Sequence, residues 1–419
     1  MNASAGPLTL AARHLVPIEG PPVSPGRLTI EAGRIVALEP GTPRPGDLDL
    51  GSVAILPGLV NCHVHLDLPP LGGPPAGVVD LASWLEHIVN RRAAWAPRQA
   101  IAQVEAGIAA SMRSGTTLLA DITPAGLSWD ALAASPIRAV VFAELIGLRR
   151  ERAMATSAQA FEWLGQIRRS GFDRGRLRPG LSPHAPYSTV GWLYERAAAA
   201  GVPLSTHLAE SPAETEFLNA GTGPLRAFLE RIGAWPDDAW APLGPRPADY
   251  IRKGALKQAD WIVAHGTYLD ESDFWQLRPQ AAPSGQRVAV AYCPRSTAYF
   301  GHGPHPFAAM IERGIAVALG TDSLASTPSL SILDEIRWLH QRHPELPAQL
   351  LLLMGTLAGA WALRFDDEVG SLVPGKRADL AVVSVDPTSD EPAQAVVAGR
   401  GPVIGTMVDG TWVYGPCST

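Results

Sequence analysis

The feature that most constrains the fold is a repeated alternation of two kinds of segment. Eight short apolar runs, rich in β-branched residues, recur between residues 58 and 323, and segments with the apolar spacing of helices separate them. The runs are GLVNCHVHL, TTLLADIT, IRAVVFAEL, LRPGLSP, PLSTHLAE, WIVAHGTYL, VAVAYCPRS and IAVALGTDS. Eight strand–helix units predict an α/β fold, a TIM-type (β/α)8 barrel. The alternative, an open doubly wound sheet, favours a GxGxxG loop after the first strand, and none follows it here.

The two ends of the 419-residue chain have a different pattern. PLTLAARHLVP and GRLTIEAGRIVALEPG near the start, and PGKRADLAVVSVD and VIGTMVDGTWVYG near the end, alternate short β-type runs with glycine turns. We therefore expect a small β-sandwich domain formed by both chain termini, residues 1–57 and 373–419, beside a barrel over residues 58–372. A chain of this length has room for both units.

Polar residues concentrate at the carboxyl ends of the predicted strands, where barrels of this type place their chemistry. His63 and His65, in LPGLVNCHVHLDLPP, stand at positions i and i+2 and so point to the same side of a strand. Such a pair alone says little, because structural histidines can share its spacing. The ends of the other predicted strands add His184, His207, Glu210, His265 and Asp322. Since the 11 histidines of the chain would not gather on one rim by chance, the set predicts a metal site.

We assign His63, His65, His207 and Asp322 as ligands of one divalent metal ion per chain. Three imidazoles and one carboxylate suit Zn²⁺, with Fe²⁺ as the alternative, and leave one position open for water. A binuclear site in this type of barrel usually needs a bridging group, such as a carboxylated lysine, near the end of the fourth strand. The three lysines of the chain lie elsewhere in the sequence, at Lys253, Lys257 and Lys376. The same shortage argues against a Schiff-base aldolase.

Two of the remaining polar residues are candidates for acid–base chemistry. A metal in this site would lower the pKa of a bound water toward ~7. Glu210, three residues after His207, is placed to take the released proton and deliver it to the substrate. The alternative for Glu210 is a solvated glutamate that opens the next helix. His265 is either a fifth ligand or, as we prefer, a hydrogen-bond partner that aligns the hydroxide; Asp322 belongs to both the catalytic and the ligand set.

Several motifs, taken together and in this order, resemble the amidohydrolase superfamily. They are PGLVNCHVHL, THLAES, AHGTYL, LGTDS and GSLVPGKRADLAVV, and the resemblance covers nearly the whole chain. Within the superfamily the pattern is similar to the mononuclear deaminase branch, which contains adenosine, S-adenosylhomocysteine and cytosine deaminases and triazine hydrolases. The resemblance implies zinc held by the four assigned ligands, with Glu210 shuttling protons and His265 polarising the water.

Two further motifs narrow the choice of substrate. YCPRSTAYFGHGPHPF and GTDSLASTPSLSILDE look most like aminofutalosine deaminases, which act on 6-amino-6-deoxyfutalosine in the futalosine route to menaquinone. The resemblance implies hydrolytic removal of the 6-amino group of an adenine nucleoside derivative. Alternatives within the class are S-adenosylhomocysteine, methylthioadenosine or adenosine as the substrate, or a triazine-type chlorohydrolase. The alternative from another class is a metal-binding barrel without activity, but a pure binder would need neither Glu210 nor His265.

Five residues are candidates for contact with the substrate, and each has a structural alternative. GLSPHAPYS resembles the segment by which nucleoside deaminases contact the purine, so His184 is a candidate base-binding residue or else a structural histidine. Trp84 and Glu86, in ASWLEHIVNRR, are candidates to line the pocket, although Trp84 suits a helix face packed on the barrel equally well. Glu144 would bind sugar hydroxyls or form an internal salt bridge, and His302 would touch the substrate or belong to a plain loop. A substrate benzoate needs a cation, and the candidates near rim loops are Arg91, Arg92, Arg149, Arg150 and Arg295.

Charge and cysteine content limit the partners and the compartment. A net charge of −6 gives no electrostatic footprint for nucleic acid or an anionic membrane, so we expect neither as a partner. The family resemblance implies a small-molecule purine nucleoside as the partner, and a homo-oligomer stays open. The longest apolar run, LLLLMGTLAGAWAL, is shorter than the ~20 residues of a membrane span. The cysteines lie far apart without CxxC spacing, and the start lacks a basic segment followed by an apolar one. We therefore expect a reducing, cytoplasmic location.

Overall fold

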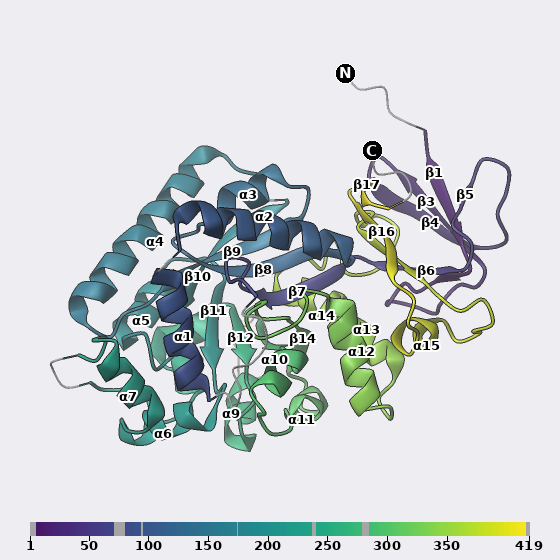
Figure 1. Cartoon of the computed structure of the whole chain (residues 1–419). Helices are drawn as coiled ribbons and strands as arrows, with labels where there is room; N and C mark the ends of the chain where they lie inside the picture. Colours follow the sequence, from purple (N-terminus) through teal and green to yellow (C-terminus); the bar gives the residue numbers. More distant parts are fainter. Residues whose placement is uncertain are drawn as a thin grey trace.

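The computed structural model describes residues 6–70, 80–93, 95–173, 175–236, 240–278 and 285–415. Within these ranges, an eight-stranded parallel sheet surrounded by helices forms the larger part of the molecule (Figure 1). Two smaller sheets lie together on one side of it, and they contain both β1 (Leu8–Ala12) and β17 (Thr411–Tyr414) (Figure 1). The first and last strands of the described chain therefore belong to one small unit, each in a different sheet.

The eight predicted apolar runs form the eight parallel strands in sequence order. They are β7 (Leu59–Val64), β8 (Thr116–Pro124), β9 (Arg138–Leu145), β10 (Leu177–Pro183), β11 (Leu204–Leu208), β12 (Trp261–His265), β13 (Val288–Tyr292) and β14 (Ala316–Leu319). All eight residues of β9 are buried, as expected for a parallel strand that helices cover on one face and the barrel interior on the other. The segment after β14 returns to β7, because Val64 and Asp322 form a parallel bridge and the Asp322 N–H donates to the His63 carbonyl at 3.0 Å. The sheet is thus a nearly closed barrel, as the sequence predicts.

Helices follow the strands and cover the barrel. The helices are α1 (Leu81–Ala93), α2 (Pro97–Arg113), α3 (Trp129–Ala134), α4 (Arg150–Ser170), α5 (Gly191–Ala198), α6 (Pro212–Ala220), α7 (Pro224–Arg231), α8 (Asp249–Arg252), the 3₁₀ turn η1 (Gly254–Gln258), α9 (Glu271–Leu277), α10 (Pro294–Tyr299), α11 (Phe307–Glu312), α12 (Ile332–Arg342), α13 (Ala348–Met354) and α14 (Leu357–Ala362). Local signals explain several of their ends. Ser331 caps the start of α12 by accepting from the Asp334 N–H, and α4 ends at Gly171, whose φ of 66° suits glycine.

The two small sheets pack on each other through a shared core. One sheet has the order β4 (Arg34–Pro40), β3 (Gly26–Glu31), β1 and β5 (Leu48–Asp49), and the other has the order β17, β16 (Val403–Val408), β15 (Leu380–Ser384), β6 (Val53–Pro57) and β2 (His14–Leu15). A short helix, α15 (Pro392–Val397), joins β15 to β16. Leu10 and Leu28 of the first sheet share a buried cluster with Ile55, Leu380 and Met407 of the second. The predicted β-sandwich from both termini is confirmed, while the exact domain boundaries stay a prediction.

The small unit attaches to the amino ends of the barrel strands. Arg138, the first residue of β9, is buried and donates to both carboxylate oxygens of Asp379, at 2.9 and 3.3 Å. The Asp379 carbonyl accepts from the N–H of Gly58, just before β7, at 2.8 Å. This arrangement leaves the carboxyl ends of the strands available for a functional site. In the described ranges, no helix combines the length and the apolar character needed to cross a bilayer.

Candidate active site

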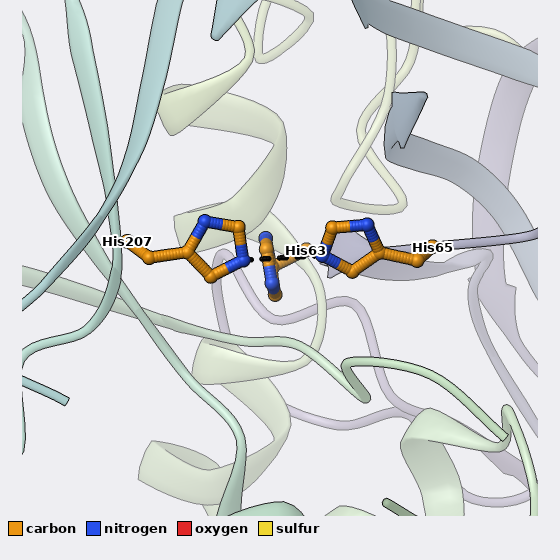
Figure 2. A group of neighbouring side chains, drawn as sticks. All are labelled: His63, His65 and His207. Carbon is orange, nitrogen blue, oxygen red and sulfur yellow. Dashed lines mark hydrogen bonds between the residues drawn. The ribbon is translucent and has the colours of Figure 1, made fainter. Parts of the chain in front are cut away.

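Three histidines from two strands meet inside the carboxyl end of the barrel. His63 lies in β7, His65 follows that strand, and His207 lies in β11, and all three are buried. Figure 2 shows the three rings directed toward one another. One ligand atom from each lies within 4.8 Å of the others, and the Nε2 atoms of His65 and His207 are 3.1 Å apart. The i, i+2 spacing in β7 therefore brings His63 and His65 to one point, as the strand period requires.

Asp322 completes this cluster from the segment after β14. Its Oδ1 atom lies 3.8 Å from Nε2 of His63 and 3.9 Å from Nε2 of His65. Its other oxygen, Oδ2, accepts hydrogen bonds from the hydroxyls of Ser296, at 2.8 Å, and Ser326, at 2.6 Å. Asp322 also has a left-handed backbone with a φ of 61°, which is uncommon outside glycine. The carboxylate is thus held with one oxygen facing the histidines.

The protonation of the cluster suits a metal cation. Burial, followed by the neighbouring histidines, lowers the pKa of His63, His65 and His207, and for His207 the pKa falls to about 3. Neutral imidazole is the form that binds a metal. Both ring nitrogens of His63 are buried and lack a hydrogen-bond partner among the described residues, which is the arrangement a bound cation would satisfy. Three nitrogens and one carboxylate oxygen fit Zn²⁺ or Fe²⁺.

The chain offers no lysine to bridge two metals at this point. Lys253 and Lys257 lie at η1, and Lys376 donates to the side chains of Ser371 and Glu19 beside the small sheets. None of the three lines the cavity described below. The arrangement is therefore that of a candidate mononuclear site.

Glu210 and His265 lie next to each other beside the cluster. Oε1 of Glu210 is 3.6 Å from Nε2 of His265, and both side chains are buried. Burial raises the pKa of Glu210 well above its ordinary value, and the nearby carboxyl groups of Asp322 and Glu214 raise it further. Burial lowers the pKa of His265 well below its ordinary value. A buried carboxyl group that holds a proton more tightly than usual beside a neutral imidazole is suited to move protons at neutral pH.

Glu214, which the sequence analysis did not select, fixes the loop that carries Glu210. Its two carboxylate oxygens accept the backbone N–H groups of Ala209 and Glu210, each at 3.0 Å. Ala209 has a positive φ of 52°, so the loop needs this support to hold its shape. The only signal in the sequence is a second glutamate four residues after Glu210, in AESPAETE, and that signal does not separate a loop anchor from a surface residue.

A cavity of about 550 Å³ opens from the cluster. His65, His207, Glu210, His265 and Asp322 line it at the reactive part. The rest of its wall is largely apolar, with side chains from α1 and from the region of α7, including Leu85, Ile88, Val89, Phe228, Leu229 and Ile232. Three of the predicted substrate residues, Trp84, Glu144 and His184, line it as well. The cavity thus joins the cluster to a hydrophobic chamber of ligand-binding size.

Two other predicted substrate residues are not among the side chains that line the cavity. Glu86 receives two hydrogen bonds from Arg231 of α7, at 3.0 and 2.8 Å, and is partly exposed. Because each residue turns a helix by about 100°, Glu86 lies on roughly the opposite face of α1 from Trp84, two residues earlier. His302 instead lies 3.3 Å from the Tyr268 hydroxyl and stacks on Phe300. Both residues therefore have contacts within the protein, and their contact with a substrate stays a prediction.

The candidate arginines also divide into two groups. Arg92 and Arg149 line the cavity, and so does Arg152, which the sequence analysis did not select. Arg91 and Arg150 are exposed side chains outside the cavity lining. Arg295 is held inside the protein by Glu335, with Nε 2.7 Å from Oε1. Three arginines therefore line this cavity, and one of them, Arg92, donates to Asp67.

Arg92 belongs to a group of charged residues on the cavity wall. Its Nη2 donates to Oδ2 of Asp67 at 2.8 Å, and its Nη1 lies 3.5 Å from Oε2 of Glu144. The other oxygen of Glu144 lies 3.9 Å from Nε2 of His184. His184 in turn accepts the Nδ1–H of His207 at its backbone carbonyl, at 2.9 Å. Arg92, Glu144 and His184 thus follow one another along the wall toward the metal-binding cluster, and Asp67 pairs with Arg92.

The barrel, the histidine and aspartate cluster at its carboxyl end and the adjacent Glu210–His265 pair define a hydrolase of the metal-dependent barrel class. The sequence model of the amidohydrolase family matches residues 54–413. The chain belongs to the amidohydrolase family, and it is a hydrolytic enzyme whose curated relatives include deaminases.

Similar proteins agree in fold and family. The 5-methylthioadenosine/S-adenosylhomocysteine deaminase of Moorella thermoacetica is 30% identical over 94% of this chain and 90% of its own length. Aminofutalosine deaminase of Helicobacter pylori, in complex with methylthio-coformycin, has a TM-score of 0.80 with 23% identity and covers 97% of this chain and 100% of its own. An adenosine deaminase from Xanthomonas campestris with bound zinc has a TM-score of 0.77 with 24% identity and covers 97% of this chain and 93% of its own. These two structures share the fold.

Proposed function

We propose that this enzyme hydrolytically deaminates the 6-amino group of an adenine nucleoside derivative. The observation that carries the proposal is the Glu210–His265 pair, 3.6 Å apart, which lies beside the metal-binding cluster at one part of the cavity. The names of the curated relatives support the same chemistry. A metal-binding barrel without activity has no use for a buried acid–base pair at this position.

In this proposal each residue of the cluster has a defined task. His63, His65, His207 and Asp322 would hold one divalent cation, for which zinc is the best candidate and iron(II) the alternative. When bound, such a cation supplies the Lewis acidity that makes water a nucleophile at neutral pH. His265 orients the attacking water by a hydrogen bond. Glu210 takes a proton from that water and passes it to the substrate.

The bond changes balance with these groups alone. The water oxygen adds to C6 of the purine, and its proton passes to Glu210. Glu210 returns a proton to the departing amino group, the C6–N bond breaks, and ammonia leaves. The remaining hydroxyl proton moves to the ring, which leaves the carbonyl of a hypoxanthine. The raised pKa of Glu210 suits a group that must both accept and donate a proton near pH 7.

We further propose that the substrate carries a carboxylate and that 6-amino-6-deoxyfutalosine is the preferred one. Arg149 and Arg152 line the cavity and supply cationic groups for an anion. Trp84, Tyr187 and Phe228 supply aromatic surface for a benzoate ring. The α-amino acid of S-adenosylhomocysteine would also need an anion for its ammonium group. Among the described lining residues the carboxylates are Glu144, Glu210 and Asp322, and each already faces Arg92 or the cluster.

The second candidate substrate pair is 5-methylthioadenosine and S-adenosylhomocysteine. The observation that favours it is the 30% identity to a deaminase of that name over 94% of this chain. Adenosine itself shares the reacting group but lacks a carboxylate.

A side-by-side measurement of kcat/KM for aminofutalosine, adenosine, methylthioadenosine and S-adenosylhomocysteine tests these proposals. We expect aminofutalosine to exceed adenosine by about 100-fold or more, because a charged hydrogen bond and ring stacking add roughly 1.5–3 and 0.5–1.5 kcal/mol. Equal values, or a preference for S-adenosylhomocysteine, would reject aminofutalosine while the deaminase proposal stands. No ammonia from any of the four would reject both.

A pair of arginine variants separates the carboxylate contact from general damage. Arg152→Met should lower kcat/KM for the carboxylate substrate about 10-fold or more and leave adenosine turnover nearly unchanged. Arg150→Met is the matched control, because Arg150 lies two residues away on α4 and is exposed outside the cavity lining. Equal effects of the two substitutions would contradict the proposed contact.

A further inference from the structure

His265 ends β12 in a backbone conformation that histidine seldom adopts. Its φ is 66°, and Gly266 follows with a φ of 72°, so the strand ends in a turn of two left-handed residues. For a residue with a Cβ atom this region is sparsely populated, and such conformations persist only where the surroundings hold them. The His265 side chain meets Glu210 from this turn, with Nε2 3.6 Å from Oε1. The direction of the ring therefore depends on what fixes the turn.

Two backbone hydrogen bonds fix the turn on the side of β11. The Gly266 N–H donates to the Leu208 carbonyl at 3.0 Å, and the Tyr268 N–H donates to the Ala209 carbonyl at 2.8 Å. Ala209 directly precedes Glu210, so the turn is joined to the loop that carries the proposed proton carrier. These two bonds do not involve the carbonyl of the first left-handed residue.

His305 holds that carbonyl. Its Nε2 atom lies 2.7 Å from the His265 carbonyl oxygen, and because a carbonyl only accepts, Nε2 carries the proton and donates it. The His305 ring is buried and stacks on Tyr292, at the end of the neighbouring strand β13, with centroids 3.8 Å apart and 19° between the planes. The ring cannot turn its donor away from the carbonyl without losing this stack. Packing therefore fixes the position of the donor.

Packing alone does not account for a histidine at this position. The ring of Phe307 also stacks on Tyr292, with centroids 5.4 Å apart, so a phenyl ring suits this cluster. A buried imidazole costs more free energy than a buried phenyl ring, because its nitrogen atoms lose their hydrogen bonds to water. Nδ1 of His305 is buried without a hydrogen-bond partner among the described residues. The bond from Nε2 to the His265 carbonyl is therefore the contact that explains the imidazole.

We propose that His305 is a positioning residue for the proposed deamination, and that its hydrogen bond to the His265 carbonyl sets the direction of the His265 ring beside Glu210. This inference rests on the proposed function. His305 is not among the described residues that line the cavity, so it acts through His265 and not by contact with the substrate. Loss of the hydrogen bond should therefore lower kcat and leave KM nearly unchanged.

Two substitutions of His305 separate the hydrogen bond from the stacking. His305→Phe keeps an aromatic ring on Tyr292 and removes the donor, so we expect kcat to fall about 10- to 100-fold, with KM and metal content near the native values. His305→Gln loses the ring but keeps an N–H donor, so it should retain most of the native kcat. His343→Phe is the matched control and should leave kcat unchanged, because His343 packs on Phe307 of the same cluster, with centroids 5.5 Å apart. If His305→Phe does not fold, His305→Leu replaces it with the same expectation.

Two further measurements test whether His305 acts through His265. In a His265→Asn background, which already lacks the imidazole, the added change His305→Phe should lower kcat less than about twofold. Crystal structures of the native enzyme and of both His305 variants give the second measurement. The His265 ring should keep its native direction toward Glu210 in His305→Gln and lose it in His305→Phe.

The outcomes separate this inference from the proposed function. A native kcat in His305→Phe, an equal loss in His305→Gln, or losses that multiply in the double variant would overturn the role of His305 while deamination stands. If the native enzyme deaminates no adenine nucleoside, the proposed function fails, and the crystal structures still decide the inference. An unmoved His265 ring in His305→Phe would then overturn it, and a displaced ring would support it.

Discussion

The hydroxyl oxygen of Ser326 lies 2.6 Å from Oδ2 of Asp322. Ser296 donates to the same oxygen at 2.8 Å, so Oδ2 has two close donors and Oδ1 remains directed at His63 and His65. Residues that hydrogen-bond a ligating carboxylate fix its orientation and tune its affinity for metal. The two serines are therefore expected to set how Asp322 presents its free oxygen.

Replacing Ser326 by alanine should weaken metal binding. We expect the affinity for zinc to fall roughly 10- to 100-fold, as is usual when a partner of a metal ligand is lost. Competition with a calibrated chelator measures it. Ser170→Ala is the control, because that hydroxyl donates only to the Ile167 carbonyl at the end of α4. An unchanged zinc affinity would show that Asp322 is oriented by its backbone alone.

Purified enzyme should contain one tightly held divalent metal per chain, most readily zinc. The expectation follows from one cluster of three histidines with Asp322 and from lysines that all lie outside the cavity. Elemental analysis after removal of loosely bound metal provides the count. Two equivalents per chain would show that the argument from the lysines is wrong.

Glu210→Gln should keep the metal and lose at least ~100-fold in kcat, since it retains size and removes the proton carrier. Metal content and kcat are measured on the same sample. The matched control is Glu216→Gln on α6, where the carboxylate accepts from the Thr222 hydroxyl at the surface. Turnover close to that of the native enzyme would move the proton transfer elsewhere, with His265 the first residue to examine.

His305 should make the fold sensitive to acid. Its ring is buried, stacks on Tyr292 with centroids 3.8 Å apart, and has Nε2 2.7 Å from the His265 carbonyl, and burial lowers its pKa to about 4. A histidine with a lowered folded-state pKa stabilises the fold fully above about pH 6.5, and this contribution is lost as the pH falls toward 4. His305→Gln removes the titration, so the stability difference between native and variant protein should shrink by about 2 to 3 kcal/mol between pH 7 and pH 4.5.

Denaturant unfolding of the metal-free proteins at both pH values gives this difference. Metal-free samples are used because metal binding has its own pH dependence. If native and variant proteins lose stability in parallel over this range, His305 is not the group that titrates.

The barrel was predictable because its signals are local. Each strand is a short apolar run between turn residues, and the polar residues that end the strands must meet at one rim whatever the details of the loops. This rule selects six site residues from the sequence, and the structure brings them together: His63, His65, His207, Glu210, His265 and Asp322.

The cavity wall was less predictable because helix rotation decides it. Trp84 faces the cavity and Glu86 pairs with Arg231, yet a sequence gives only the relative angle between the two, not which of them points inward. The sequence analysis missed three other residues for a related reason: Arg152, Glu214 and Asp67. Their roles depend on partners distant in sequence or on a loop shape, such as the positive φ of Ala209, that no short motif specifies.

The pairing of β6 with β15 has a consequence for the order of events during synthesis. Residues 53–57 lead directly into the strand that carries His63, and their neighbour in the sheet, Leu380–Ser384, lies more than three hundred residues later. A nascent chain therefore presents β6 as an open edge until almost the whole protein has left the ribosome, and such edges attract other strands. A chain truncated before residue 380 would contain every assigned metal ligand, but its β6 would lack the partner strand β15. We expect such a product to aggregate rather than to catalyse.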